Sequence, residues 1–191
     1  TRLRVHPPQD GAVRLEGVID SPSLAGHAEM TLRPGAETRM RLRVTLLPRV
    51  EIGDIGIAPL TSMYLKGPLN AAVSDDFRPR VHDSDALVIL NGAGETLWRP
   101  IANPARLQAS AFVDDGPAAF GLWQTPRAFA DYEDEEARYH RRPSALVRPA
   151  GDWGPGAVTL VEIPTGTEFM DNIVAFWRPA APLAAGSEHA F

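Results

Sequence analysis

The stretch TRMRLRVTLLP, residues 38–48, alternates polar and apolar side chains over most of its length. A period of two is typical of a β-strand that buries one face and leaves the other in water. VRLEGVID (13–20) and HAEMTLRP (27–34) repeat this pattern, and glycine and proline residues punctuate the three stretches. The pattern predicts half-buried antiparallel strands.

Strand signals continue through the rest of the chain. The further stretches are ALVIL (86–90), ETLWRP (95–100), RLQASAFV (106–113), AFGLWQ (119–124), SALVRP (144–149), AVTLVEIP (157–164) and NIVAFWRP (172–179). Turn signals such as NGAGE and DDGP separate them at spacings typical of all-β proteins. We therefore predict an all-β fold, an antiparallel β-sandwich. In RAFADYEDEEARYHRRP, early acids, late bases and a final proline predict one short helix near residues 127–142.

Composition and charge narrow the class of function. Hydrophobic residues make up 44% and charged residues 23% of the 191, which is typical of a globular chain. The net charge of −5 and the scattered Lys and Arg argue against a nucleic-acid partner. No apolar run reaches the roughly 18 to 20 residues that a membrane helix needs. The absence of cysteine excludes disulfides and thiolate metal sites. The charge balance makes a neutral or polar ligand the better fit.

Two motifs with carboxylates stand directly before apolar strands. HDSD (82–85) precedes ALVIL, and Asp171 with Asn172 precedes IVAFW. A carboxyl group at a strand entrance, shielded by aromatic neighbours, can have its pKa raised by desolvation and so keep a proton to donate. A pair of such groups suits glycoside hydrolysis, which needs one acid and one base.

The residues of HDSD also allow other interpretations. Strand alternation would place Asp83 and Asp85 on one face, and His82 and Ser84 on the other. Either aspartate could instead cap a turn while Ser84 satisfies a backbone group. A metal site that uses the imidazole and both carboxylates is a third interpretation, although no HxH or HExxH pattern accompanies it.

Aromatic and arginine side chains near segment ends are candidates for sugar binding. They are Tyr64, Trp98, Trp123, Arg78 and Arg99. The flat rings suit stacking on sugar faces, and the guanidinium groups suit hydrogen bonds to hydroxyls. Core or turn packing is the alternative for the rings, and pairing with acids such as Asp76 is the alternative for the arginines.

Longer blocks of sequence resemble a known family. The blocks include DDFRPRVHDSDAL (75–87), LWRPIANPARL (97–107), YEDEEARYHRRPS (132–144) and GDWGPGAVTLVEIPTGTEFMDNIVAFW (151–177). In content and order they resemble the periplasmic glucan biosynthesis proteins of the OpgG/OpgD (MdoG/MdoD) family. The resemblance implies a location in the Gram-negative periplasm. It also implies a role in making osmoregulated periplasmic glucans, whose backbones are β-1,2-linked glucose.

The resemblance also implies a domain organisation. Residues 1–180 would be the second half of a larger N-terminal sandwich that binds and cleaves glucan, and residues 181–191 would begin a linker to an immunoglobulin-like domain. The N-terminus TRLRVHPPQD lacks the features of a signal peptide. It also lacks an initiator Met and opens within the approach to a strand, so we expect a fragment or a processed piece of a longer protein. The expected partner is a β-glucan polysaccharide, with a homodimer left open. We expect no cofactor and no metal.

Finally, the resemblance implies chemistry. Members of this family are assigned an inverting endo-β-1,2-glucanase activity, which by motif makes Asp83 the general base and Asp171 the general acid. The side chains expected to contact or orient the substrate are His82, Ser84, Asp85, Tyr64, Arg78, Trp98, Arg99, Trp123 and Asn172. The alternative function is a non-hydrolytic glucan-binding factor that guides nascent chains.

Overall fold

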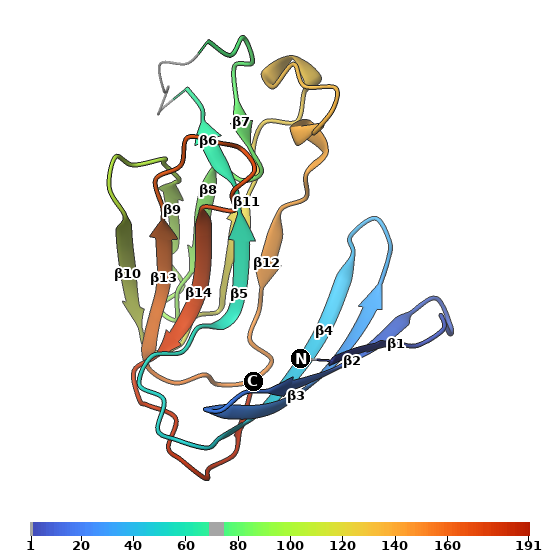
Figure 1. The fold of residues 1–191 in the computed structure, drawn as a ribbon, viewed down its shortest axis with the longest axis vertical. Helices are drawn as coiled ribbons and strands as arrows, with labels where there is room; N and C mark the ends of the chain where they lie inside the picture. The colour runs from blue at the N-terminus through green and yellow to red at the C-terminus, as the bar shows by residue number, and fades with distance from the viewer. Residues whose placement is uncertain (1, 69–74) are drawn as a thin grey trace. The chain divides into compact units, whose positions relative to one another are not determined.

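The computed structural model describes residues 2–68 and 75–191, and β-strands dominate it (Figure 1). The chain divides into two compact units, one made of Thr1–Ile55 with Ala181–Phe191 and the other of Gly56–Ala180. Neighbouring strands pair antiparallel in both units. The predicted all-β antiparallel fold is confirmed. No helix in the described ranges has the length and apolarity needed to cross a membrane.

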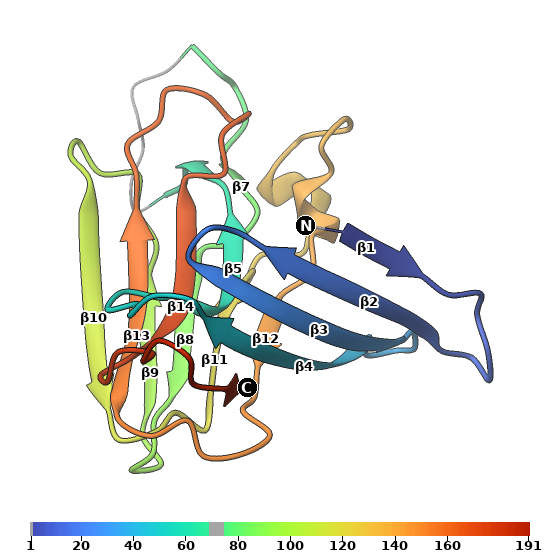
Figure 2. The ribbon, with the colours of Figure 1, turned by 60° about the horizontal axis from the view of Figure 1, so that its bottom comes forward.

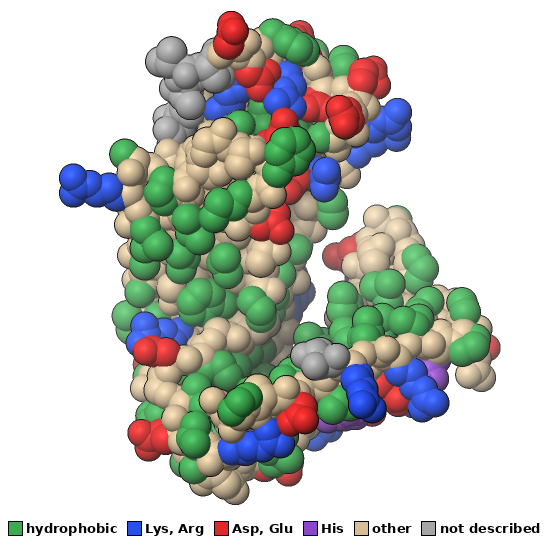
Figure 3. All heavy atoms as spheres, in the orientation of Figure 1, with side chains coloured by type: hydrophobic (Ala, Val, Ile, Leu, Met, Phe, Trp, Pro, Cys, Tyr) green, Lys and Arg blue, Asp and Glu red, His purple; other side chains and the backbone are tan. Residues whose placement is uncertain are grey.

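The first unit is built on one five-stranded sheet in the order β1-β2-β3-β4-β15. Its strands are β1 (Arg2–Val5), β2 (Val13–Asp20), β3 (Leu24–Arg33), β4 (Arg39–Pro48) and β15 (His189–Ala190). The register aligns Val5, Leu15, Met30 and Leu42 in one row across four strands. Because side chains alternate along each strand, one face of the sheet is apolar and the other polar, as Figure 3 shows.

Residues 181–191 take part in the first unit. β15 pairs with β4, and Phe191 exchanges two backbone hydrogen bonds of 2.9 Å with Val44. Leu183 and Ile52 form a further antiparallel bridge. The residues that the family resemblance assigns to the start of a linker therefore carry an edge strand of this sheet.

The second unit contains two four-stranded sheets and a two-stranded ribbon. One sheet has the order β10-β13-β14-β5, the other β12-β11-β8-β9, and β6 pairs with β7. The bounds are β5 (Ile57–Ser62), β6 (Tyr64–Lys66), β7 (Val81–His82), β8 (Ala86–Leu90), β9 (Thr96–Pro100), β10 (Gln108–Asp114), β11 (Ala119–Trp123), β12 (Ala145–Val147), β13 (Gly156–Glu162) and β14 (Ile173–Pro179). Figures 1 and 2 show the two larger sheets packed face to face as a sandwich.

The core of the second unit lies between these two sheets. Leu87 and Phe120 come from one sheet, and Leu160 and Trp177 from the other, and all four side chains are fully buried. Each lies on a strand whose inward positions are apolar, which is the arrangement that aligned sandwiches use. The packing fixes both sheets, and therefore the loops that leave their ends.

The structure contradicts the single helix predicted near residues 127–142. Two one-turn 3-10 helices replace it, η1 (Phe129–Asp131) and η2 (Tyr139–Arg141). Glu133 and Arg138 have left-handed backbone angles, with φ of 52° and 51°, which end a right-handed helical path. Between them, Asp134 Oδ1 accepts the backbone N–H of Ala137 at 2.6 Å, a local bond that competes with helix formation.

Candidate functional site

The HDSD motif forms a bend between two strands. β7 ends at His82 and β8 begins at Ala86, so three residues connect them. The backbone N–H of Asp83 donates to Met63 O at 2.8 Å, and that of Asp85 donates to Trp123 O at 2.8 Å. One end of the bend is thus tied to the residue between β5 and β6, and the other to the end of β11, which fixes the direction of each side chain.

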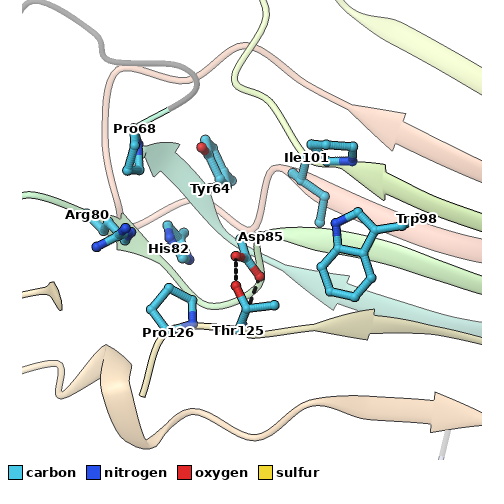
Figure 4. Close-up of a pocket in the computed structure, with 10 residues that line it drawn as sticks. Tyr64, Pro68, Arg80, His82, Asp85, Trp98, Ile101, Thr125 and Pro126 are labelled. Atoms are coloured by element: carbon cyan, nitrogen blue, oxygen red, sulfur yellow. Dashed lines mark hydrogen bonds between the residues drawn. The ribbon is translucent and has the colours of Figure 1, made fainter. Parts of the chain in front are cut away.

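This bend sends its side chains into two different grooves. Asp83 and Ser84 line a groove of about 230 Å³. His82 and Asp85 line a second groove of about 300 Å³, shown in Figure 4. The alternation expected from sequence, which placed both aspartates on one face, is therefore wrong. The cause is that these residues form a bend and not an extended strand.

Asp83 lies in a partly shielded, charged environment. Its side chain is 24% exposed, and its Oδ1 lies 3.3 Å from the Nε of Arg142. Burial raises the pKa of Asp83, the Arg142 charge opposes that shift, and the negative charge of Asp171 adds to it. The segments of Asp83 and Asp171 are also tied to adjacent residues, because Asp83 N–H donates to Met63 O and Asn172 bonds the backbone of Tyr64.

Asp171 is exposed at the end of the loop that connects β13 to β14. The next residue, Asn172, is fully buried. The Asn172 side chain accepts the backbone N–H of Tyr64 at 2.8 Å, and it donates to Tyr64 O at 3.0 Å and to Ile163 O at 2.9 Å. Both amide N–H groups are used in this way, so Asn172 fixes the backbone directly after Asp171, the second candidate acid.

The aromatic side chains of Tyr64 and His82 line the groove in Figure 4. Their rings stack with centroids 5.1 Å apart and planes 7° apart. Behind them, the buried ring of Tyr132 packs edge-on against His82, with centroids 5.2 Å apart. Burial lowers the pKa of His82 to about 4 and raises that of Tyr64 to about 12. Both rings are therefore uncharged near neutral pH.

Asp85 and Trp98 stand on the walls of the same groove (Figure 4). Asp85 Oδ1 accepts the backbone N–H of Thr125 at 3.0 Å, and its Oδ2 accepts the Thr125 hydroxyl. Trp98 is 51% exposed. The β8 register places Trp98 opposite Val88 and Trp123 opposite Ala86, so both tryptophans lie on the outer face of their sheet.

Both candidate arginines are paired with acids. Arg78 donates to the carboxylates of Asp76, Asp134 and Glu168. Arg99 donates to Glu162 at 2.8 Å, and that buried carboxylate also accepts the backbone N–H of Ala102 at 2.7 Å. Of the two roles that the sequence left open for these arginines, pairing with acids is the one that their contacts in the structure fill.

The arrangement does not favour the metal interpretation of HDSD. Across residues 2–68 and 75–191, no group of three or more His, Asp or Glu side chains is placed to hold a metal ion. Asp83 also lines a different groove from His82 and Asp85.

Sequence reasoning missed Arg142 and Glu168. Arg142 was interpreted as part of the basic end of a helix, yet it lies beside Asp83. Glu168 pairs with Arg78 across 90 positions of sequence. No local sequence pattern predicts either contact, because each one joins loops that are far apart in the chain.

Comparison with known proteins places these motifs in context. A family model described as "Periplasmic glucan biosynthesis protein, MdoG" matches residues 1–191. The "Glucans biosynthesis protein G" of Vibrio cholerae serotype O1 is 55% identical over 177 residues, and that of Shewanella frigidimarina is 54% identical over 177 residues. Each alignment covers 93% of this chain and 32% of the relative. The chain therefore spans about a third of the length of the curated relatives it matches.

Proposed function

The chain belongs to the family of periplasmic glucan biosynthesis proteins called MdoG, and from this membership we propose that it acts in periplasmic glucan biosynthesis. Within the longer protein, its role is to cleave β-1,2-linked glucan internally with inversion at the anomeric carbon. Asp83 is the general base and Asp171 is the general acid. The substrate class and the periplasmic location rest on the family's description and on the sequence motifs.

The common anchoring of the two acids is the observation that carries this proposal: Asp83 N–H donates to Met63 O, and Asn172, next to Asp171, bonds the backbone of the adjacent Tyr64. An inverting glycosidase needs two carboxyl groups about 6.5 to 9.5 Å apart, so that a water molecule fits beside the sugar. Asp171 affects the pKa of Asp83, which supports their presence around one reaction centre. Asp83 remains 24% exposed beside Arg142, so this ion pair leaves it open to water.

The two acids have environments that suit different tasks. Arg142 favours the ionised form of Asp83, and a base must be ionised to accept a proton. Asp171 is exposed in the free protein. This exposure leaves its carboxyl group accessible to the glycosidic oxygen of a bound glucan, the atom to which a general acid gives its proton.

The reaction then balances in one step. The carboxyl proton of Asp171 moves to the glycosidic oxygen as the bond from that oxygen to the anomeric carbon breaks. A water molecule attacks this carbon from the opposite face while Asp83 accepts its proton. The products are two shorter glucans, one with an inverted anomeric centre, and exchange of protons with solvent restores both carboxyl groups.

A non-hydrolytic glucan-binding role is the second candidate. The exposed rings of Trp98 and Trp123 on the outer face of one sheet favour it, because flat aromatic faces stack on sugar rings without any need for catalysis. This candidate predicts that the full-length protein binds linear β-1,2-glucan and returns it with its length unchanged.

Incubation of the full-length protein with linear β-1,2-glucan separates the two candidates. We expect shorter chains, new reducing ends and an α-configured product at first, with activity lost in Asp83→Asn and in Asp171→Asn. Asp115→Asn, which removes an exposed carboxylate in the turn between β10 and β11, is the matched control and should retain activity. Unchanged chain length would reject hydrolysis, and binding without cleavage would support the second candidate.

A further inference from the structure

Arg78 lies at the meeting point of three segments of the second unit. Its side chain is 17% exposed, and its donors face three carboxylates. Nε donates to Asp76 Oδ1 at 3.0 Å and Nη2 donates to Asp76 Oδ2 at 2.7 Å. Nη2 and Nη1 donate to the two oxygens of Glu168 at 2.9 and 3.0 Å, and Nη1 donates to Asp134 at 2.5 Å. Every nitrogen of the guanidinium is therefore engaged.

Each segment that Arg78 joins carries a charged group of the candidate site. Glu168 belongs to the loop that ends in Asp171. Asp134 accepts the backbone N–H of Ala137 and so shapes the turn that leads to Arg142. Arg78 itself precedes β7 and the Asp83 bend. Arg78 therefore links the segments that lead to Asp83, Asp171 and Arg142.

The loop that carries Asp171 has two anchors with an exposed tip between them. On its N-terminal side, Glu168 binds Arg78 and also accepts the Tyr139 hydroxyl at 2.5 Å. On its C-terminal side, buried Asn172 binds Tyr64 in β6 and also Ile163, the first residue of the same loop. Phe169, between the anchors, is 93% exposed. Backbone fixed at both ends holds the position of the acid even though the tip itself packs against little.

The charge balance explains why this meeting point needs an arginine. Three carboxylates converge on it, and the Nζ of Lys66 lies 3.8 Å from Asp76 Oδ2. Hydrogen bonds from Arg78 lower the pKa of Asp76 to about 2 and hold that of Glu168 below its usual value. All three acids are thereby kept ionised, and a planar guanidinium can bind two of them with paired bonds, which an ammonium group cannot do.

We infer that Arg78 is a positioning residue for the acid pair. It sets where the Asp171 loop lies relative to the Asp83 bend, and it does so without touching the substrate, since its donors are already used. Its importance for hydrolysis rests on the proposed function above. Its structural action, which is to restrain the loop through Glu168, does not.

Two variants of the full-length protein test this inference. Arg78→Lys keeps the charge and loses the paired geometry, and Glu168→Gln keeps the shape and weakens the bonds to Arg78. Arg49→Lys is the control for the Arg-to-Lys change itself, because Arg49 makes an exposed ion pair with Asp20, at 2.9 Å, in the first unit. Amide hydrogen exchange of residues 165–172, followed by mass spectrometry, reports the restraint directly. Steady-state hydrolysis of linear β-1,2-glucan reports its effect on catalysis.

We expect faster exchange of residues 165–172 in both variants and no change in the control. We also expect kcat to fall about 10- to 100-fold with KM within about twofold, because misplacement of a catalytic group by about 1 Å costs roughly 100-fold in rate. If KM rises while kcat and exchange stay unchanged, Arg78 is a substrate contact and the inference fails. Unchanged exchange with both kinetic constants unaltered also overturns it. If the wild type does not cleave glucan, the hydrolase proposal fails, and hydrogen exchange still decides whether Arg78 restrains the loop.

Discussion

The Nε of Arg142 lies 3.3 Å from the Oδ1 of Asp83, at the edge of the groove that contains the proposed base. The two residues come from different loops, one after η2 and one between β7 and β8. Arg142 is nearly half exposed, so its charge acts through water as well as through protein. The pair therefore adjusts the protonation of Asp83 without closing it away from solvent.

Replacement of Arg142 by Gln should move the acid limb of the activity profile to higher pH. Burial already raises the pKa of Asp83, and Arg142 opposes that rise, so removal of the cation leaves the carboxyl group protonated at a higher pH. A base must be ionised, so kcat/KM should fall at a higher pH than in the wild type, by roughly 0.5 to 1 unit for a half-exposed pair. Profiles of kcat/KM against pH check this, and Arg142→Lys should keep most of the wild-type limb. An unmoved limb in Arg142→Gln would contradict the assignment of that limb to Asp83.

Asp171→Asn should lower the pKa of Asp83. The negative charge of Asp171 disfavours a second negative charge nearby, so its removal makes ionisation of Asp83 easier. The carboxyl carbon of Asp83, followed by NMR through a pH titration of the wild type and the variant, measures the change. Asp115→Asn serves again as the distant control. This measurement tests the convergence of the two acids without any assay of activity, and identical titration curves would refute it.

Asn172→Ala should destabilise the fold by about 2 to 4 kcal/mol, because it leaves buried partners of three hydrogen bonds unsatisfied. Those partners are the N–H and C=O of Tyr64 and the C=O of Ile163. Urea unfolding at neutral pH gives the difference. Asn91→Ala, which removes a side chain that bonds Glu95 in an exposed turn, should cost far less. Equal losses in the two variants would show that the buried amide has no special role.

The stability of the second unit should fall as the pH drops from about 6.5 towards 4. Burial lowers the pKa of His82 to about 4 in the folded state, so over this range the unfolded chain binds a proton that the folded chain rejects. The free energy of unfolding should then decrease by up to about 1.4 kcal/mol per pH unit. His82→Gln removes this contribution, so its stability should vary less across the same range, as urea titrations at several pH values will show.

The carboxylates around Arg78 act in a different pH window. The pKa of Asp76 is lowered to about 2 and that of Glu168 also lies below its usual value. A lowered carboxyl pKa contributes stability above the unfolded value, near 4, and this contribution is lost as the pH falls further. A His82→Gln protein that still loses stability between pH 6.5 and 4.5 would therefore contradict the assignment to His82.

Most strands could be predicted because their alternation is a direct consequence of burying one face. β2 (Val13–Asp20) and β8 (Ala86–Leu90) match the predicted stretches residue for residue. β5 was not predicted, because Pro59 interrupts its pattern. The strand tolerates this proline because β5 lies at the end of its sheet, where a proline need not donate to a further neighbour. The positive φ of Ala58 coincides with an irregularity in the register between β5 and β14.

The candidate site could be predicted only in part. The sequence pointed to Asp83 and Asp171 because each precedes an apolar strand, and their catalytic roles stay a prediction. It could not show that His82 and Asp85 line a separate groove, since that depends on backbone bonds to residues far away in the chain. The sequence could not show the pairing of Arg78 with Glu168 either, because only the folded loops bring these two residues together.

The bend between β7 and β8 constrains the length of this segment as well as the identity of its residues. Met63 and Trp123 accept the backbone N–H groups of Asp83 and Asp85, so insertion or deletion of a single residue between these two bonds would disturb the assignment of side chains to the two grooves. A substitution alters one wall of one groove, whereas a change of length would disturb both grooves at once.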